Sequence, residues 1–245
     1  MKKHLLLFPA IMAAFFATAQ TASTDLAIQN LKGKVRSVNE TVYEATEKFG
    51  EVEKGTKTDR YYQEYNSAGM ELQYLQESYD EGEKDKFVRT ARYENDKLAE
   101  MKEDDNGDVE LSRYKYNQQG LLESIDGLDR KDNLLYRQKN KYNADGLLTQ
   151  ADSYKGDGSL EIRTVNSYNA KKQVVKKEWY DQDGKLTRLQ TYVYDGRGKV
   201  VEESSIDYKR KEQKPYIRKY AYNDKNQKIE ERNSIAGLDH KEIYE

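Results

Sequence analysis

A tyrosine followed by a short turn-forming segment recurs along most of this chain, and this repeat limits the folds open to it. The recurring segments are YNSAG, YENDK, YNQQG, YNADG, YNAKK, YDGRG and YNDKN, which begin at Tyr65, Tyr93, Tyr116, Tyr142, Tyr168, Tyr194 and Tyr222. The intervals between these tyrosines are 28, 23, 26, 26, 26 and 28 residues. Because a fixed period of about 20–50 residues is the signature of a repeat architecture, we expect an array of similar units, each contacting its neighbours.

Each unit divides into two halves, because a second turn follows the first after about twelve residues. These second turns are YDEGEK, DDNGDV, YKGDGSL and YDQDGKL, which begin at Tyr79, Asp104, Tyr154 and Tyr180. Asp, Asn and Gly are favoured in such turns because they tolerate a positive φ. The intervening segments, such as LTRLQTYVY (186–194), are rich in Thr, Val, Tyr and Leu, and the chain has only 2 prolines. The sequence therefore predicts an all-β fold, an elongated array of antiparallel β-hairpins that forms either an open spiralling sheet or a closed solenoid.

Alternation along the strands predicts which side chains share a face of the sheet. The predicted same-face sets are Val174 with Tyr180, Leu186 with Tyr192 and Tyr194, Leu148 with Tyr154, and Leu160 with Ile162. Charged residues such as Lys176 and Glu178 occupy the middles of the strands. We therefore expect a thin wall with solvated ion pairs, each worth about 0.2–1 kcal/mol, and no compact two-layer core.

The ends of the array differ from its repeats, as a repeat protein requires. We divide the chain into a signal peptide (1–19), an N-terminal cap (20–50), the hairpin repeats (51–232) and a C-terminal half-repeat (233–245). The cap is predicted to contain a short helix through LAIQNL and a first long strand over 34–45. The Lys-rich stretch DYKRKEQKP is expected to be an insertion in a turn.

The first nineteen residues, MKKHLLLFPAIMAAFFATA, have the basic start, short apolar run and small residues of a secretory signal. No later stretch has the roughly 20 apolar residues that a membrane span needs. The sequence holds 0 cysteines, so disulfides, a thiol nucleophile and a lipid-anchor cysteine are excluded. We expect a periplasmic or extracellular protein.

Composition argues for a folded chain without a nucleic-acid partner. Charged residues make up 35% of the sequence, a share that is typical of disordered chains. The sequence also contains 21 tyrosines, however, and a tyrosine ring can be buried while its hydroxyl forms a hydrogen bond. Without Lys2 and Lys3 of the signal, 40 Lys and Arg face 44 Asp and Glu. Nucleic-acid binding usually needs a clustered basic excess, so we expect no such partner.

The pattern Y-N/D-x-x-G-x-L/V, followed by a strand and a further tyrosine, resembles the tyrosine–aspartate (YD, or RHS-type) repeats of secreted and cell-surface bacterial proteins over about residues 61–232. The leader LKGKV (31–35) makes the chain similar to a group of small exported Bacteroidetes-type proteins. The resemblance implies a spiralling antiparallel sheet and an exported location, and it implies no catalytic residue. The chain departs from the pattern, since Tyr-Asp occurs only at Tyr194-Asp195 and no self-cleaving sequence is present. MORN-like hairpin repeats, a second similar group, also imply an elongated β array.

Little in the sequence favours catalysis. His240 is the only histidine after the signal, and we expect it to be a solvated or capping residue. The two catalytic carboxyl groups of a glycosidase lie about 5–9.5 Å apart. Strands about 4.8 Å apart bring many carboxylates to such distances by chance, so the spacing alone does not indicate catalysis. We therefore expect no enzyme and no cofactor, with a carboxylate-based glycoside hydrolase as a distant alternative.

Two acidic turns are weak calcium candidates. Their residues are Asp104, Asp105, Asp108, Asp181 and Asp183. Neither turn has the distal glutamate at the spacing of an EF-hand, and Asp before Gly is what a plain hairpin turn also requires. We therefore expect turn chemistry and no metal site.

Exposed aromatic residues are the best candidates for a binding surface. Trp179, the only tryptophan, is followed by Tyr180, and adjacent strand residues point to opposite faces. We select Trp179, Tyr180, Tyr154 and Tyr192 as ligand-binding candidates, although all four rings could be purely structural. The sequence thus favours a binding protein for a glycan or a cell-envelope protein. The alternative is a structural or assembly scaffold, and the oligomeric state stays open.

Overall fold

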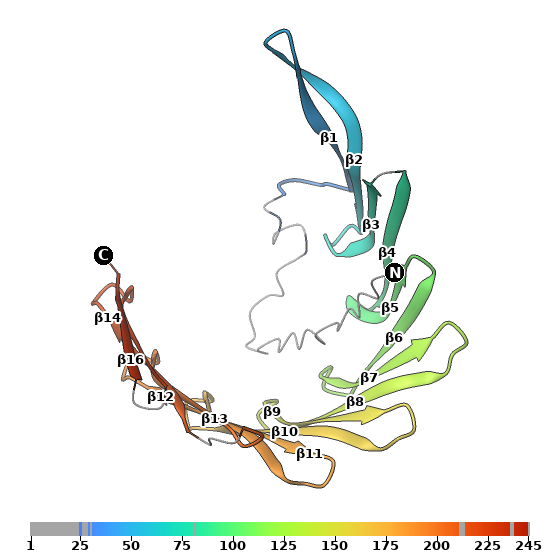
Figure 1. Ribbon diagram of the computed structural model, residues 1–245. Coiled ribbons are helices and arrows are strands. Elements are labelled where there is room, and N and C mark those ends of the chain that lie inside the picture. The colour runs from blue at the N-terminus through green and yellow to red at the C-terminus, as the bar shows by residue number, and fades with distance from the viewer. Residues whose placement is uncertain are drawn as a thin grey trace.

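A computed structural model of the chain describes residues 25, 29, 31–80, 82–210, 214–235 and 238–244. These residues form one sheet of 16 antiparallel strands, in which every strand pairs with the next along the chain (Figure 1). The strands are β1 (Ser37–Lys48), β2 (Glu51–Tyr65), β3 (Glu71–Asp80), β4 (Glu83–Glu94), β5 (Lys97–Asp105), β6 (Asp108–Tyr116), β7 (Leu122–Asp129), β8 (Leu134–Tyr142), β9 (Leu148–Lys155), β10 (Leu160–Tyr168), β11 (Val174–Asp181), β12 (Leu186–Tyr194), β13 (Val200–Asp207), β14 (Tyr216–Tyr222), β15 (Lys228–Ile235) and β16 (Leu238–Ile243).

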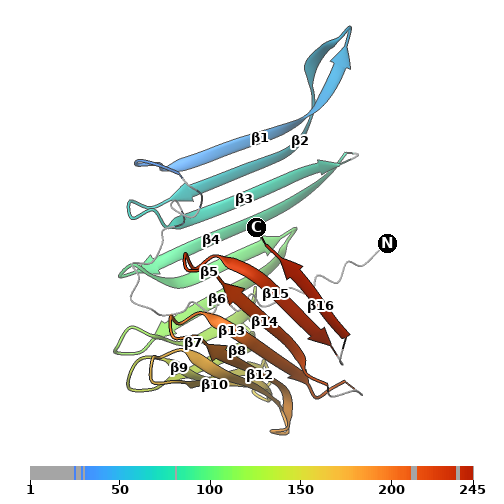
Figure 2. The same ribbon diagram turned by 90° about the vertical axis from the view of Figure 1, so that its left-hand side faces the viewer.

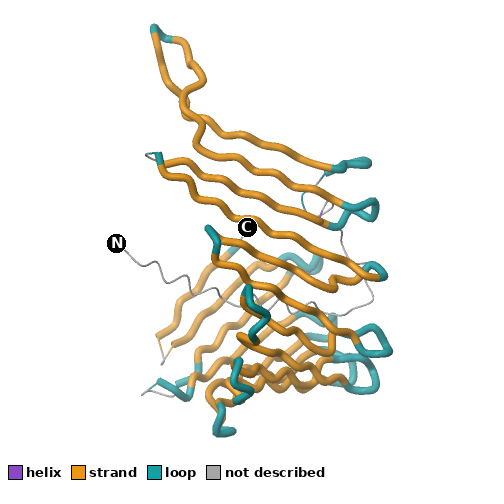
Figure 3. The backbone as a smooth tube through the Cα atoms, turned by 90° about the vertical axis from the view of Figure 1, so that its right-hand side faces the viewer, coloured by secondary structure: helices purple, strands orange, loops and turns teal. Residues whose placement is uncertain are grey.

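The sheet is a single layer that curves into an open arc (Figures 1 and 2). The turns line the two long edges of the arc (Figure 3). Within the described part of the chain, β1 pairs only with β2 and β16 only with β15, so the array does not close. The predicted all-β array of hairpins is confirmed, and the open sheet is the correct one of the two predicted forms.

The ends of the array agree with the sequence where they are described. The first long strand, β1, begins and ends a few residues later than predicted. The signal peptide and most of the predicted helix lie outside the described residues, although the Gln29 N–H donates to the Asp25 carbonyl at 3.2 Å, as in a helical turn. The Lys-rich stretch lies between β13 and β14, where an insertion was expected.

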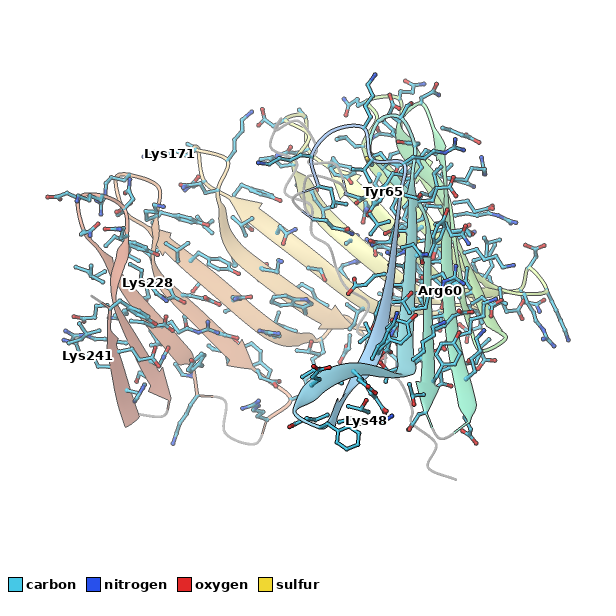
Figure 4. All side chains as sticks on the ribbon, turned by 90° about the horizontal axis from the view of Figure 1, so that it is seen from above. Lys48, Arg60, Tyr65, Lys171, Lys228 and Lys241 are labelled. Carbon is cyan, nitrogen blue, oxygen red and sulfur yellow. The ribbon has the colours of Figure 1, made fainter. Side chains whose placement is uncertain are left out.

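The two faces of the sheet carry different side chains. In Figure 1 the segment that leads into β1 lies on the concave side of the arc. We call the concave face the inner face. It bears Tyr65, whose hydroxyl donates to the Gln29 Oε1 at 2.9 Å. The convex face is called the outer face, and the cross-strand register assigns the other strand residues to one face or the other. Figure 4 shows side chains standing on both faces of the single layer.

An Asn or Asp side chain holds most of the turns. In the turn after β8, the Asn143 Oδ1 accepts the N–H groups of Asp145 and Leu147 at 3.0 and 2.9 Å. The Asn143 N–H donates to the Leu147 carbonyl, and Gly146 follows in the left-handed region with φ 76°. This is a type I turn with a left-handed residue behind it, a common three-residue hairpin loop. The same side-chain bonds recur from Asn66, Asn117, Asp129, Asn169, Asp181, Asp195 and Asn223.

The tyrosine that ends every second strand closes a gap between strands at the edge of the sheet. The Tyr142 hydroxyl donates to the Leu122 carbonyl at 2.8 Å, and the Asn140 amide donates to the same oxygen at 3.0 Å. The last paired residues of β7 and β8 at this end are Ser124 and Lys139. The two side chains therefore bond a backbone carbonyl of β7 that lies beyond the last cross-strand pair. Tyr116, Tyr168, Tyr194 and Tyr222 make the equivalent bond at 2.7–3.0 Å.

The predicted same-face sets were wrong for the first residue of each strand, because a β-bulge follows most turns. The register pairs Leu148 with Tyr142 on the inner face, whereas Tyr154 lies on the outer face. It likewise places Leu186 opposite Tyr180 on the outer face, away from Tyr192. The other affected residues are Val174, on the inner face with Tyr168, and Leu160, on the outer face with Tyr154. A bulge adds one residue to a strand, so residues on its two sides that are an even number of positions apart point to opposite faces of the sheet.

Very few side chains are fully buried, as expected for a thin wall. Among the described residues, the buried hydrophobic ones are Tyr65, Leu128 and Ala151. Apart from the exposed Tyr43, the other aromatic rings of the strands are half-buried, each against its neighbours in the single layer. The fold therefore depends on backbone pairing and on side-chain hydrogen bonds more than on a core.

Replacement of Tyr194 by Phe tests the edge hydrogen bond. The change removes the hydroxyl that donates to the Val174 carbonyl at 2.7 Å, so we expect the free energy of unfolding to fall by about 1 kcal/mol. Tyr192→Phe is the matched control, because Tyr192 lies on the same strand and face and its hydroxyl makes no hydrogen bond to the described residues. Urea unfolding followed by circular dichroism measures both. Equal losses would contradict this role of the hydroxyl.

Replacement of Gly184 by Ala tests the left-handed turn position. A Cβ at Gly184 would meet no atom within 4 Å, but φ is 75°, so the cost of the left-handed backbone alone should lower stability by about 1–2 kcal/mol. Gly196→Ala also adds a Cβ in open space, at a turn position without a positive φ, and should be neutral or slightly stabilising. Thermal unfolding of the two variants gives the comparison. An unchanged stability of Gly184→Ala would show that the left-handed backbone at this position has no measurable free-energy cost for a residue with a side chain.

Candidate ligand-binding face

The outer face carries charges that are largely paired with one another. One cross-strand row runs through Arg92, Glu100, Arg113, Asp126 and Arg137 on neighbouring strands, with alternating sign. Arg137 donates two hydrogen bonds to Asp126, at 2.6 and 2.7 Å. One repeat later, Arg163 binds Asp152 in the same way, at 2.7 and 3.0 Å. These pairs hold adjacent strands in register, which is a structural role.

Two of the predicted binding residues, Tyr154 and Tyr180, lie on this outer face, and both are half-buried. Tyr180 lines a shallow hollow of about 330 Å³ together with Arg163. The Tyr154 hydroxyl donates to the Asp152 carboxylate at 3.3 Å. Burial opposes ionisation of Asp152, but the bonds from Arg163 and Gln150 prevail and lower its pKa. Arg163, the cation that lines this hollow, is therefore already paired with Asp152.

Most aromatic rings of the strands lie on the inner face. The register and the alternation place these there: Tyr61, Tyr65, Tyr74, Phe87, Tyr93, Tyr114, Tyr116, Tyr136, Tyr142, Tyr168, Trp179, Tyr192, Tyr194, Tyr216, Tyr220 and Tyr222. The outer face carries Tyr62, Tyr79, Tyr154 and Tyr180. The rings are thus gathered on the concave side of the single layer, where Gln29 of the N-terminal segment bonds Tyr65.

Trp179 lies on the inner face of β11, and the opposite orientation of Trp179 and Tyr180 is confirmed by the register. Its cross-strand neighbours are Thr164, which is buried, and Arg188, whose guanidinium is 4.9 Å from the centre of the indole. The Lys177 ammonium is 5.6 Å from the same ring. The candidate site is therefore an aromatic ring between two cations.

Tyr192 lies on the inner face two residues beyond Gln190, which faces Lys177 across the strands. The structure thus places Trp179 and Tyr192 on one face and Tyr154 and Tyr180 on the other, so the four predicted residues do not form one site. Burial raises the pKa of Tyr192, and Glu203 across the strand adds to the shift. Arg218 lies beyond Glu203, and its Nε is buried without a hydrogen bond among the described residues.

A second inner-face cluster, in the N-terminal half, was not predicted from the sequence. Glu103 and Glu110 are direct cross-strand neighbours, and Arg89 faces Glu103 from the other side. Burial raises the pKa of Glu103, Arg89 opposes the shift and Glu110 adds to it. The Tyr136 hydroxyl donates to the Glu110 carboxylate at 2.9 Å. Strand alternation alone could not identify the cluster, because its members come together only through the register of β4, β5, β6 and β8.

Gly127 lets the Tyr136 ring reach that cluster. A Cβ at Gly127 would lie 2.2 Å from the ring of Tyr136, so the ring crosses β7 where a side chain is missing. Burial, with a contribution from Glu110, raises the pKa of Tyr136 to about 12. Nearby, a hollow of about 270 Å³ is lined by Asp25, Glu71, Arg89, Tyr93 and Met101 among others. In that hollow, Arg89 binds Glu71 at 2.5 and 3.0 Å.

The weak calcium candidates serve as turn residues. The Asp104 carboxylate accepts the Gly107 N–H at 2.9 Å, and Asp181 accepts those of Asp183 and Lys185 at 3.1 and 3.0 Å. Asp105 and Asp108 are paired across a two-residue turn. The described residues contain no group of three or more acidic, His or Cys side chains placed to bind a metal. His240 is exposed on β16, 3.5 Å from Glu242.

Comparisons with known proteins give structural neighbours at low identity. A family model described as an uncharacterised protein matches residues 125–237. No curated protein matches the chain. A porin-like protein from Bacteroides uniformis is similar at 12% identity and a TM-score of 0.42, over 75% of this chain and 87% of that one. The TcdB2-TccC3 structure is similar at 10% identity and a TM-score of 0.41, over 84% of this chain and 13% of that one.

A form of TcdB2-TccC3 without its hypervariable C-terminal region aligns in the same way, at 11% identity and a TM-score of 0.41, over 77% of this chain and 12% of that one. Membership of this chain in the YD repeat group stays a prediction from the sequence. In the described part of the chain, no helix has the length and apolar character to cross a membrane.

Two carboxylate substitutions should change stability in opposite directions. The pKa of Asp152 is lowered in the fold, so its charge stabilises the protein above about pH 4 and this contribution is lost as the pH falls. Asp152→Asn should therefore cost about 1–2 kcal/mol at pH 7. The pKa of Glu103 is raised, so its ionisation at pH 7 opposes folding, and Glu103→Gln should stabilise.

Urea unfolding at pH 7 and at pH 3.5 measures both effects. Both differences should shrink at pH 3.5. The raised pKa of Glu103 leaves that carboxyl largely protonated there, and the stabilisation from Asp152 begins to be lost because the unfolded chain takes up a proton first. A loss of stability on Glu103→Gln at pH 7 would contradict the like-charge argument. An unchanged stability on Asp152→Asn would contradict the structural role of its pair with Arg163.

Proposed function

We propose that the mature chain is an exported, non-enzymatic glycan-binding protein and that the sugar lies on the inner face around Trp179. The segregation of aromatic rings to the concave face supports this proposal. Amphipathic rings suit a sugar, because one surface of a pyranose is apolar while its rim carries hydroxyls. Both faces of the single layer are open in the described part of the chain, and the concave face is the one on which the rings gather.

Polar groups next to Trp179 support recognition of a hydroxylated ligand. Asn166 lies beside Lys177 in the register, and its Oδ1 is buried without a hydrogen bond among the described residues. Its amide nitrogen donates to the Leu148 carbonyl at 2.9 Å, which fixes the side chain. Gln190 lies one strand further and binds Glu203. A few positioned polar groups beside a ring are the usual composition of a small-ligand site.

A glycan array with one inner and one outer aromatic variant tests this function. We expect Trp179→Ala to reduce glycan binding at least tenfold, because it removes the indole ring that Lys177 and Arg188 flank. Tyr180→Ala should leave binding unchanged, because the neighbouring ring points to the outer face. Circular dichroism and thermal unfolding of both variants show whether the fold is retained.

Two results would contradict the proposal. Binding that is lost in folded Tyr180→Ala and kept in Trp179→Ala would move the site to the outer hollow. Absence of binding to every glycan by the native chain would exclude the glycan function and leave the protein partner or the scaffold.

A protein partner in the cell envelope is the second candidate, and the hairpin of β1 and β2 favours it. This hairpin projects beyond the rest of the sheet (Figures 1 and 2). Phe49 at its tip is fully exposed, and Val52 is 78% exposed. Exposed apolar side chains on a projecting element are typical of protein contacts. Cross-linking of envelope fractions by the native chain and by Phe49→Ser would distinguish this candidate.

A further inference from the structure

The charges around Trp179 are arranged differently from those on the rest of the sheet. Lys177 and Arg188 flank the indole at 5.6 and 4.9 Å, and within the described residues neither forms an ion pair. On the outer face, by contrast, the neighbouring Lys176 is 3.0 Å from Glu178. Two cations side by side on one face repel each other, so their placement needs a reason beyond sheet stability.

The carboxylates close to these cations in the register form hydrogen bonds or ion pairs with other groups. Asp207 faces Arg188 in the register, but its two oxygens bind the Lys209 N–H at 2.9 Å and Arg210 at 3.3 Å. Asp181, two residues from Trp179, accepts backbone N–H groups of its own turn. Neither cation therefore forms an ion pair with a carboxylate in the described part of the chain, although Asp207 is the cross-strand neighbour of Arg188.

The surroundings of Lys177 agree with an uncompensated charge. The side chain is half-buried, and burial lowers its pKa, with a further contribution from Arg188. A bound anion would reverse both effects, because it would replace lost solvation and screen the neighbouring guanidinium. The N-terminal half of the inner face has the opposite character, since Glu103 and Glu110 face each other there.

We propose that the ligand of the inner face is an acidic glycan, whose carboxylate or sulfate binds Lys177 and Arg188 while the sugar ring stacks on Trp179. This inference rests on the proposed glycan-binding function and names the class of sugar. The guanidinium and the ammonium each donate charge-assisted hydrogen bonds to such a group. The acidic N-terminal half of the same face repels an anionic chain, so binding is confined to the strands from β10 to β12.

The test uses acidic polysaccharides and neutral polymers made from them. The full mature chain is titrated with polygalacturonate, alginate, hyaluronan and chondroitin sulfate, and with the same polymers after carboxyl reduction and desulfation. We expect at least one acidic polymer to bind about tenfold more tightly than its neutral form at low salt. The preference should shrink as ionic strength rises, because exposed charges are screened.

Variants of adjacent lysines provide the matched control. Lys177→Gln with Arg188→Gln should reduce the acidic preference to less than about twofold, whereas Lys176→Gln, which also removes one positive charge but from the outer face, should retain it. Trp179→Ala should weaken binding of the acidic and neutral polymers alike. Thermal unfolding confirms that each variant is folded.

The outcomes separate this inference from the function on which it rests. Equal binding of acidic and neutral polymers, lost in Trp179→Ala, would overturn the acidic preference and leave the glycan function standing. An acidic preference that survives the loss of Lys177 and Arg188 would overturn the assignment of the anion site. Absence of binding to all of these polymers and to the glycan array would overturn both.

Discussion

The hydrogen bond from a strand-ending tyrosine to a carbonyl of the preceding strand is the interaction on which this array depends. In this single-layer sheet each strand pairs only with its neighbours, so stability is largely the sum of local interfaces. The Tyr168 hydroxyl bonds the Leu148 carbonyl at 2.7 Å, beyond the point where the paired register of β9 and β10 ends at Gln150. The tyrosine thus pairs a backbone group that the ladder leaves free, and an unpaired group of this kind is costly when it is removed from water.

The first repeat shows a variant of this bond, although β1 lies beside β2 as each later strand lies beside its predecessor. Tyr65 is the most buried aromatic residue, at 3% exposure, and its hydroxyl bonds the side-chain oxygen of Gln29. In the same place Asp25 accepts the Glu71 N–H at 2.6 Å. A side chain of the N-terminal segment therefore accepts the hydrogen bond that a strand carbonyl accepts in the later repeats from Tyr116, Tyr142, Tyr168, Tyr194 and Tyr222.

The sequence was sufficient to predict the repeat, the strands and the turns, because these depend on residues close together in the chain. Asn143 and Gly146 specify their turn locally, and non-glycine residues at the equivalent position, such as Lys172, still adopt a φ of 62°. The faces of individual residues were less predictable. A bulge after most of the turns shifts the alternation by one, so Leu148 and Leu186 were assigned to the wrong faces. Bulges and curvature depend on strand pairing over a whole hairpin, which single-strand periodicity does not contain.

The two faces of the sheet differ in whether their charged side chains form ion pairs, and this difference connects the fold to ligand binding. On the outer face, alternating rows such as Glu100, Arg113 and Asp126 neutralise themselves and tie strands together. On the inner face, rings replace these rows, and the cations beside Trp179 have no carboxylate partner among the described residues. A ligand on that face would lie across several strands that otherwise pair only with their neighbours. Because it binds the assembled array and not the unfolded chain, it would stabilise all the units that it crosses, and the concave face would gain the second layer that the described sheet lacks.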